Sequence, residues 1–158
     1  MVKTNAMRIL EKQGADYSVH SYDGGALSGT EVARVLGEQE DRVFKTLVTT
    51  AAPGRYYVFV IPVAAELDLK KAAAAAGEKS LDMLPQKQLL PVTGYVHGGC
   101  SPVGMKKRFR TFIDESAQSY EEIYVSAGRV GHQMRLSPQS LATFVGARFA
   151  PLASGEQE

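Results

Sequence analysis

A single cysteine, no excess of either charge and no long apolar run are the first features of this 158-residue sequence. Cys100 has no second cysteine to pair with, which excludes an internal disulfide and a multi-cysteine zinc site and suits a reducing compartment. The N-terminus leads into a charged amphipathic stretch instead of a signal-peptide core. The longest strongly apolar run, residues 56–65, contains Pro62 and is too short for a membrane span. We therefore expect a cytoplasmic protein that does not enter a membrane.

The formal net charge of +1 argues against tight, independent binding of nucleic acid. Such binding takes most of its affinity from Lys and Arg side chains that neutralise phosphates. An RNA-directed role would need a local patch, a few terminal nucleotides or a partner that brings the RNA. The one basic run, residues 106–110, is either a solvated strand start or a phosphate contact.

Alternating helix and strand signals in irregular order predict one α+β domain, because the chain is too short for two well-buried cores. Residues 56–61 are continuously apolar, which predicts a central strand covered on both faces. The patterns predict helices over 4–13, 28–37, 68–76, 85–90 and 137–146, and strands over 17–22, 42–50, 55–63, 109–115, 122–126 and 133–137.

Lys45 is the first candidate for chemistry, because it lies within the apolar segment 43–48. Alternation along a strand would ordinarily direct such a lysine to solvent. The functional alternative is a compact positive charge in a cleft that holds a phosphate or a developing oxyanion. Phe44 and Leu47 lie on opposite faces of the strand, so alternation leaves both interpretations open.

The glycine-rich segment 93–104 is the second candidate, and it cannot be regular structure throughout. Its glycines either serve turns, or leave the backbone N–H groups of Gly98 and Gly99 free for an anion or oxyanion. Neither GxGxxG nor GxxxxGK[ST] occurs in the chain, so this is not a nucleotide-binding fingerprint. His97 and Cys100 are weak evidence for a cysteine hydrolase, since a lone cysteine is more often an inert small hydrophobe.

Ser126 is the third candidate, because it ends a predicted strand close to Gly128. Turn chemistry alone would also explain this composition. The three histidines are scattered without metal-ligand spacing, and no G-x-S-x-G context supports a Ser-His-Asp triad. We therefore expect no metal and no cofactor.

Five blocks, in their order along the chain, resemble the YbaK/EbsC family of freestanding Cys-tRNA deacylases. These proteins are related to the editing domain inserted in bacterial prolyl-tRNA synthetases. The resemblance covers residues 3–152, which it implies are one editing domain with a mixed, barrel-like sheet and flanking helices, while residues 153–158 form a flexible tail. The blocks are KTNAM (3–7), VFKTLV (43–48), LDLKKA (67–72), TGYVHGGCSPVGMKK (93–107) and YVSAG (124–128).

The resemblance also implies roles for individual residues. Lys45 matches the family's essential lysine, and the loop that holds Gly98, Gly99 and Pro102 would position the terminal adenosine of the RNA. The catalytic set implied is Lys45, Gly99 and Ser126, with the Gly98–Gly99 backbone stabilising the oxyanion. The residues assigned to substrate binding are Tyr22, Thr46, Gly98, Ser101, Pro102 and Gly128.

The function implied is hydrolysis of mischarged Cys-tRNA(Pro), and as a further substrate Cys-tRNA(Cys), through attack of the bound cysteine's own thiolate on its ester. The partners implied are the acceptor end of tRNA and prolyl-tRNA synthetase. A site shaped for proline rejects cysteine poorly, because small apolar size differences are worth about 1–3 kcal/mol, and a second hydrolytic site corrects this. Two alternatives stay open: an Ala-tRNA(Pro) deacylase of the same superfamily, and a non-catalytic module that binds an RNA end or a synthetase.

Overall fold

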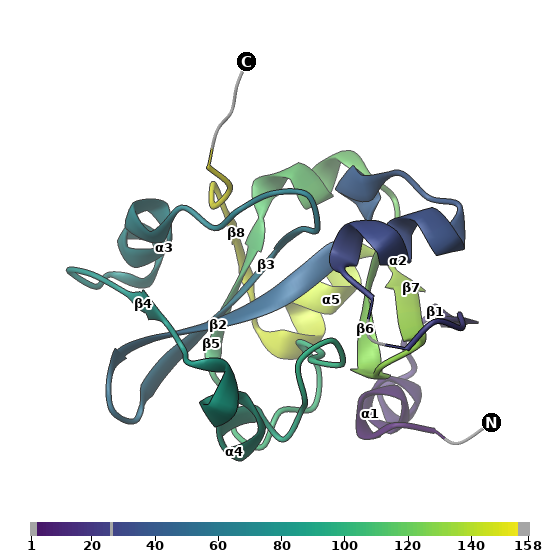
Figure 1. The fold of residues 1–158 in the computed structure, drawn as a ribbon, viewed down its shortest axis with the longest axis horizontal. Helices are drawn as coiled ribbons and strands as arrows, with labels where there is room; N and C mark the ends of the chain where they lie inside the picture. The colour runs from purple at the N-terminus through teal and green to yellow at the C-terminus, as the bar shows by residue number, and fades with distance from the viewer. Residues whose placement is uncertain (1–2, 26, 155–158) are drawn as a thin grey trace.

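The computed structural model describes residues 3–25 and 27–154, which form one α+β unit with two β-sheets (Figure 1). The helices are α1 (Asn5–Lys12), α2 (Gly29–Leu36), α3 (Leu69–Ala76), α4 (Leu89–Thr93) and α5 (Pro138–Val145), with the 3-10 turns η1 (Glu40–Arg42), η2 (Gln86–Gln88) and η3 (Glu115–Ser119). The strands are β1 (Tyr17–Ser21), β2 (Phe44–Ala52), β3 (Arg55–Pro62), β4 (Asp82–Met83), β5 (Arg110–Asp114), β6 (Ile123–Arg129), β7 (His132–Leu136) and β8 (Arg148–Ala150).

Side-chain caps fix where the helices begin. Ser28 and Glu31 form a reciprocal capping box at α2, which satisfies two otherwise free N–H groups. Asp68 accepts from two backbone N–H groups at the start of α3, and Ser137 accepts from one at the start of α5. Gly37 ends α2 in the left-handed conformation that favours glycine.

The larger sheet is mixed and has the strand order β4-β2-β3-β5-β8, and the smaller is antiparallel with the order β1-β7-β6. Within the larger sheet, β3 lies between β2 and β5, and residues 58–61 are fully buried. The predicted central, doubly covered strand is therefore confirmed. The sheets meet at a parallel bridge between Val43 and Tyr124, which brings β2 beside β6.

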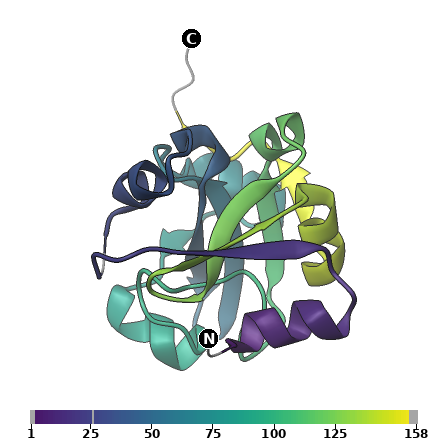
Figure 2. The same cartoon turned by 90° about the vertical axis from the view of Figure 1, so that its right-hand side faces the viewer.

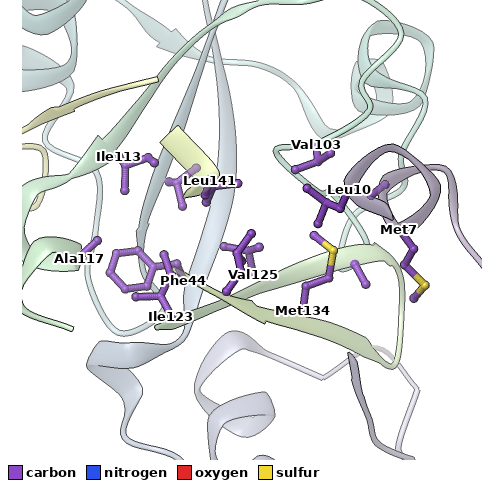
Figure 3. Packing of buried hydrophobic residues seen from close by; sticks show 14 residues of the cluster. Met7, Leu10, Phe44, Val103, Ile113, Ala117, Ile123, Val125, Met134 and Leu141 are labelled. Atoms are coloured by element: carbon purple, nitrogen blue, oxygen red, sulfur yellow. The ribbon is translucent and has the colours of Figure 1, made fainter. Parts of the chain in front are cut away.

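One face of the smaller sheet packs into the main core (Figure 3). Val125 and Met134 are opposite each other on β6 and β7, and both are buried against Leu10 of α1 and its neighbours. Because side chains alternate along strands, Ser126 and Gln133, the next opposite pair, face the other way. That other face carries Tyr124, which packs with Val32 of α2, and Figure 2 shows α1 and α2 at opposite ends of this sheet.

The α+β class and the predicted helices and main strands are confirmed, with boundaries shifted by up to three residues. Three features differ from the expectation. The sheet is divided in two instead of forming one barrel-like sheet, and the short strands β4 and β8 had no pattern of their own. The helix expected over 85–90 is the turn η2 followed by α4, which continues to Thr93.

The predicted tail is tethered at its start. Ala153 forms a bridge with Leu67, and the Ser154 N–H donates to the Glu66 carbonyl over 2.9 Å. Residues 153 and 154 of the predicted tail therefore contact residues 66 and 67, while residues 155–158 lie outside the described part. Within residues 3–25 and 27–154, no helix is both long and apolar enough to cross a bilayer.

Candidate active site

A cavity of about 170 Å³ lies where β2 and β6 separate, between α2 and the glycine-rich loop. Its floor and walls come from several parts of the chain that are distant in sequence. The residues that line it are Leu27, Ser28, Gly29, Val32, Val43, Phe44, Lys45, Thr46, Leu47, Val63, Leu89, His97, Gly98, Cys100, Ser126 and Gln133.

Lys45 and Ser126 stand together at this separation. Each lies two residues beyond the parallel bridge between Val43 and Tyr124, at the point where β2 and β6 separate. Both line the cavity. The structure therefore supports the interpretation in which Lys45 faces a cleft over the one in which it faces solvent.

Lys45 is half-buried and forms no ion pair with any described residue. Burial lowers the pKa of Lys45 below 10.5, and the negative charge of Glu66 opposes this shift. Lys45 thus holds a positive charge in a small cavity, without an ion-pair partner. Such a charge can bind a phosphate or stabilise an oxygen that gains negative charge.

The glycine-rich loop contributes Gly98 and Cys100 to the cavity wall, but not Gly99. Gly99 instead packs on the β6–β7 turn, where an added Cβ would lie 3.0 Å from the Val130 backbone nitrogen. Its N–H also donates to the Val96 carbonyl over 3.0 Å. The Gly99 N–H is therefore engaged within the loop, and the predicted Gly98–Gly99 pair of oxyanion donors stays a prediction.

The N–H groups of Gly98 and Cys100 have no hydrogen-bond acceptor among the described residues. Gly98 has φ 86°, a left-handed conformation that turns the loop at the cavity wall. The His97 N–H likewise has no acceptor among these residues, so the three loop residues that line the cavity all have an N–H group available.

Ser126 is buried, and its Oγ accepts a hydrogen bond from the Gly128 N–H over 3.1 Å. Gly128 has φ 98°, and a Cβ there would lie 3.0 Å from the Tyr95 ring. Gly128 thus holds Ser126 in place and does not line the cavity itself. No histidine or carboxylate of the described chain bonds to Ser126 Oγ, so nothing there activates it as a nucleophile.

Cys100 is also unsuited to nucleophilic attack. Its side chain is buried, and burial raises the pKa of the thiol to about 12, although a hydrogen bond with Thr93 opposes the shift. Since the thiolate is the reactive form, the thiol is inert at neutral pH. This agrees with the expectation that the lone cysteine is an inert small hydrophobe.

Of the other predicted substrate-binding residues, only Thr46 lines the cavity, and its buried Oγ1 has no hydrogen-bond partner among the described residues. Tyr22 packs beside the cavity with Leu27 and Val32, outside the lining. Ser101 is fully buried and accepts from the Val103 N–H, so it shapes the loop. Pro102 lies in a different surface hollow.

Gln133 and the start of α2 also line the cavity, although no pattern in the sequence selected them as site residues. His97, which was considered with Cys100, lines it as well. Gln133 reaches it only because β7 pairs with β6 in a register that sets it opposite Ser126. Gly29 lies so close to β3 that an added Cβ would be 2.6 Å from the Val63 side chain, which explains the glycine at that position. Among the described residues, no group of three or more His, Cys, Asp or Glu could hold a metal ion.

The family profile described as the aminoacyl-tRNA editing domain matches residues 25–144. The chain belongs to this family. A protein of Enterococcus faecalis, EbsC, is 44% identical over 156 residues, which are 98% of this chain and 95% of that protein. EbsC is named as a Cys-tRNA(Pro)/Cys-tRNA(Cys) deacylase.

Solved structures show the same editing-domain fold. One, described as a trans-editing enzyme for prolyl-tRNA synthetase, has a TM-score of 0.85 at 26% identity and covers 98% of this chain and 100% of its own. Another, a hypothetical protein, has a TM-score of 0.88 at 23% identity, covers 96% of this chain and 100% of its own, and supports the fold alone. The resemblance read from the sequence blocks is thus confirmed at the level of the family.

Proposed function

We propose that this protein is a freestanding aminoacyl-tRNA deacylase that removes cysteine from mischarged Cys-tRNA(Pro), and that Cys-tRNA(Cys) is a further substrate. The observation that carries the proposal is a small cavity with an unpaired, half-buried lysine in a member of the tRNA-editing family. At about 170 Å³ the cavity falls below the range for drug-sized ligands, and it suits a small aminoacyl group with the nucleoside at its mouth.

The lining supports chemistry in which the substrate supplies the nucleophile. Ser126 is engaged by Gly128, the Cys100 thiol stays protonated, and no Asp or Glu is among the described lining residues. His97 lines the cavity but is exposed to solvent and forms no hydrogen bond with any described residue that would orient it as a base. A mechanism that needs no base from the protein therefore fits this lining best.

In this mechanism the thiolate of the bound cysteine attacks the carbonyl carbon of its own ester. A C–S bond forms and the C–O bond to the ribose breaks, and the ribose oxygen takes a proton. The products are the uncharged tRNA and a cyclic thioester of cysteine, which water then opens to free cysteine. Well-oriented intramolecular attack supplies about 7–11 kcal/mol of barrier reduction, so positioning alone accounts for a large acceleration.

The protein's own groups hold the reacting ester and stabilise charge. The N–H groups of His97, Gly98 and Cys100 have no acceptor among the described residues and can donate to the carbonyl oxygen as it becomes negative. Lys45 supplies positive charge to the adenosine phosphate or to that oxygen. Prolyl-tRNA synthetase is the proposed partner, since the near-neutral net charge of +1 leaves tRNA binding weak without help.

Turnover is the direct test of this function. With enzyme far below Cys-tRNA(Pro) in concentration, we expect many equivalents of the ester to be cleaved per enzyme. Protection of one equivalent without turnover would instead identify a non-catalytic binding module. An Ala-tRNA(Pro) deacylase would be identified by turnover of the alanyl ester in preference to the cysteinyl one.

The pH dependence of kcat/KM follows from the two groups that the mechanism requires. The rate rises as the substrate thiol ionises, near its ordinary pKa of about 8.5, and falls as Lys45 loses its proton. Because burial lowers the pKa of Lys45, the falling limb lies below pH 10.5. Initial rates between pH 6 and 10.5, corrected for spontaneous ester cleavage, measure both limbs.

Lys45→Arg is the matched control for the falling limb, since a guanidinium stays charged throughout this range. We expect the residual activity of this variant to show the rising limb only. A falling limb that persists unchanged in Lys45→Arg would assign it to another group.

A further inference from the structure

Gln133 carries an unexplained feature inside the candidate site. Its side chain lines the cavity and is 6% exposed, yet its Oε1 has no hydrogen-bond partner among the described residues. A buried amide oxygen without a partner costs free energy, so native structures seldom retain one without a use. The feature indicates that a bound ligand supplies the missing donor.

Neighbouring side chains do not meet this need. His20 is the cross-strand neighbour of Gln133 on β1, but its Nε2 is 2.9 Å from Ser18 Oγ, within the same strand. Ser126, the neighbour on β6, accepts from the Gly128 N–H, and its hydroxyl forms no hydrogen bond with Gln133 Oε1. Met134, the next residue on β7, points into the core on the opposite face. Gln133 is therefore left to face the cavity.

The positions of the charged and polar groups define which part of the substrate meets Gln133. Lys45 is on β2, Ser126 on β6 and Gln133 on β7, so two strand spacings, about 10 Å or more, separate the backbones of Lys45 and Gln133. The anionic parts of the substrate belong at the Lys45 end. The positively charged α-amino group is repelled from that end and is a pure hydrogen-bond donor when protonated.

We propose that Gln133 binds the α-amino group of the aminoacyl ester and thereby selects primary amines over the secondary amine of proline. This inference rests on the proposed deacylase function and adds a specificity-determining residue to it. A cysteinyl ammonium presents three N–H donors, whereas the ring carbon of proline replaces one of them. The site would then leave Pro-tRNA(Pro), the correct product of the synthetase, unhydrolysed, because it recognises the amine as well as the size of the side chain.

Equilibrium binding of stable analogues tests the inference without requiring turnover. The probes are 3′-amino-3′-deoxyadenosine joined through an amide to cysteine, to 3-mercaptopropionate, which lacks only the amine, and to proline. We expect the wild-type protein to bind the cysteinyl probe about ten- to one-hundred-fold more tightly than the amine-free probe, as for a hydrogen bond to a charged group. The prolyl probe should also bind more weakly than the cysteinyl one.

Gln133→Leu should remove this preference by weakening the cysteinyl probe alone, and Gln133→Glu, which keeps an acceptor, should retain it. Equal wild-type affinities for the two thiol probes, or no measurable binding of either, would overturn the inference, as would an equal loss for both probes in Gln133→Leu. If the amine preference is present but the wild-type protein does not turn over Cys-tRNA(Pro), the proposed function fails and the inference about Gln133 stands.

Thermal unfolding of the ligand-free protein separates a binding role from a structural one. Because Gln133→Leu removes a buried oxygen that has no partner, we expect its Tm to equal or exceed that of the wild type by about 2–4 °C. A marked fall in Tm would indicate that the amide has a structural partner and would count against the inference.

Discussion

Lys45→Ala is expected to lower kcat/KM for Cys-tRNA(Pro) deacylation by about 10²–10³-fold or more. The range is that of removing one preorganised electrostatic contact from a transition state. The ammonium group lines the cavity, has no ion-pair partner within the described chain, and has its pKa lowered by burial. All three features indicate a charge kept available for the substrate. Steady-state rates with charged tRNA measure the loss.

Two matched variants make this result specific. Lys70→Ala removes an exposed lysine of α3 that does not line the cavity, and it should change kcat/KM by less than about twofold. Cys100→Ala removes the lone thiol and should retain most activity, since that thiol is buried and protonated. Loss of activity in Cys100→Ala together with an active Lys45→Ala would reverse the roles assigned to these two residues.

Removing the thiol from the substrate is expected to lower the deacylation rate as much as any substitution in the protein. Serine differs from cysteine by one atom, but its hydroxyl ionises far less readily, so intramolecular attack on the ester is lost. Because such attack supplies about 7–11 kcal/mol, we expect Ser-tRNA and Ala-tRNA(Pro) to be cleaved at least about 10³-fold more slowly than Cys-tRNA(Pro). Parallel deacylation time courses with the three charged tRNAs measure these ratios.

A binding defect must be distinguished from a chemical one in that comparison. The three aminoacyl groups are all small enough for the cavity, so their ground-state affinities should differ by far less than their rates. Single-turnover rates at saturating enzyme isolate the chemical step. Equal single-turnover rates for cysteine and alanine would contradict attack by the substrate thiol and would favour water activated by a lining group such as His97.

Local patterns in the sequence determined most of the fold. The capping box at Ser28 and the N-cap Asp68 are contacts between residues close in the chain, and both helices begin where these patterns predicted. Strand β8 was missed because three residues carry too little periodicity, and it forms only by pairing with β5. The division into two sheets depends on the bridge between Val43 and Tyr124, which joins residues 81 positions apart and leaves no local signal.

The site, too, could be predicted only in part, because some of its contacts join residues that are distant in the sequence. Lys45, Thr46, Gly98 and Ser126 were predicted from the blocks shared with the family, and all four line the cavity. The hydrogen bond from the Gly99 N–H to Val96 was not foreseen, because it depends on loop geometry that composition does not reveal. Gln133 was missed because a glutamine on a half-polar strand is unremarkable until the strand register sets it opposite Ser126.

One experiment tests the account most directly: kcat/KM measured for wild type and Lys45→Ala on both Cys-tRNA(Pro) and Ala-tRNA(Pro), with enzyme far below substrate. The account predicts fast turnover for wild type with the cysteinyl ester, and a loss of at least about 10²-fold on changing either the lysine or the aminoacyl group. Comparable turnover of the alanyl ester by wild type, or of the cysteinyl ester by Lys45→Ala, would contradict it.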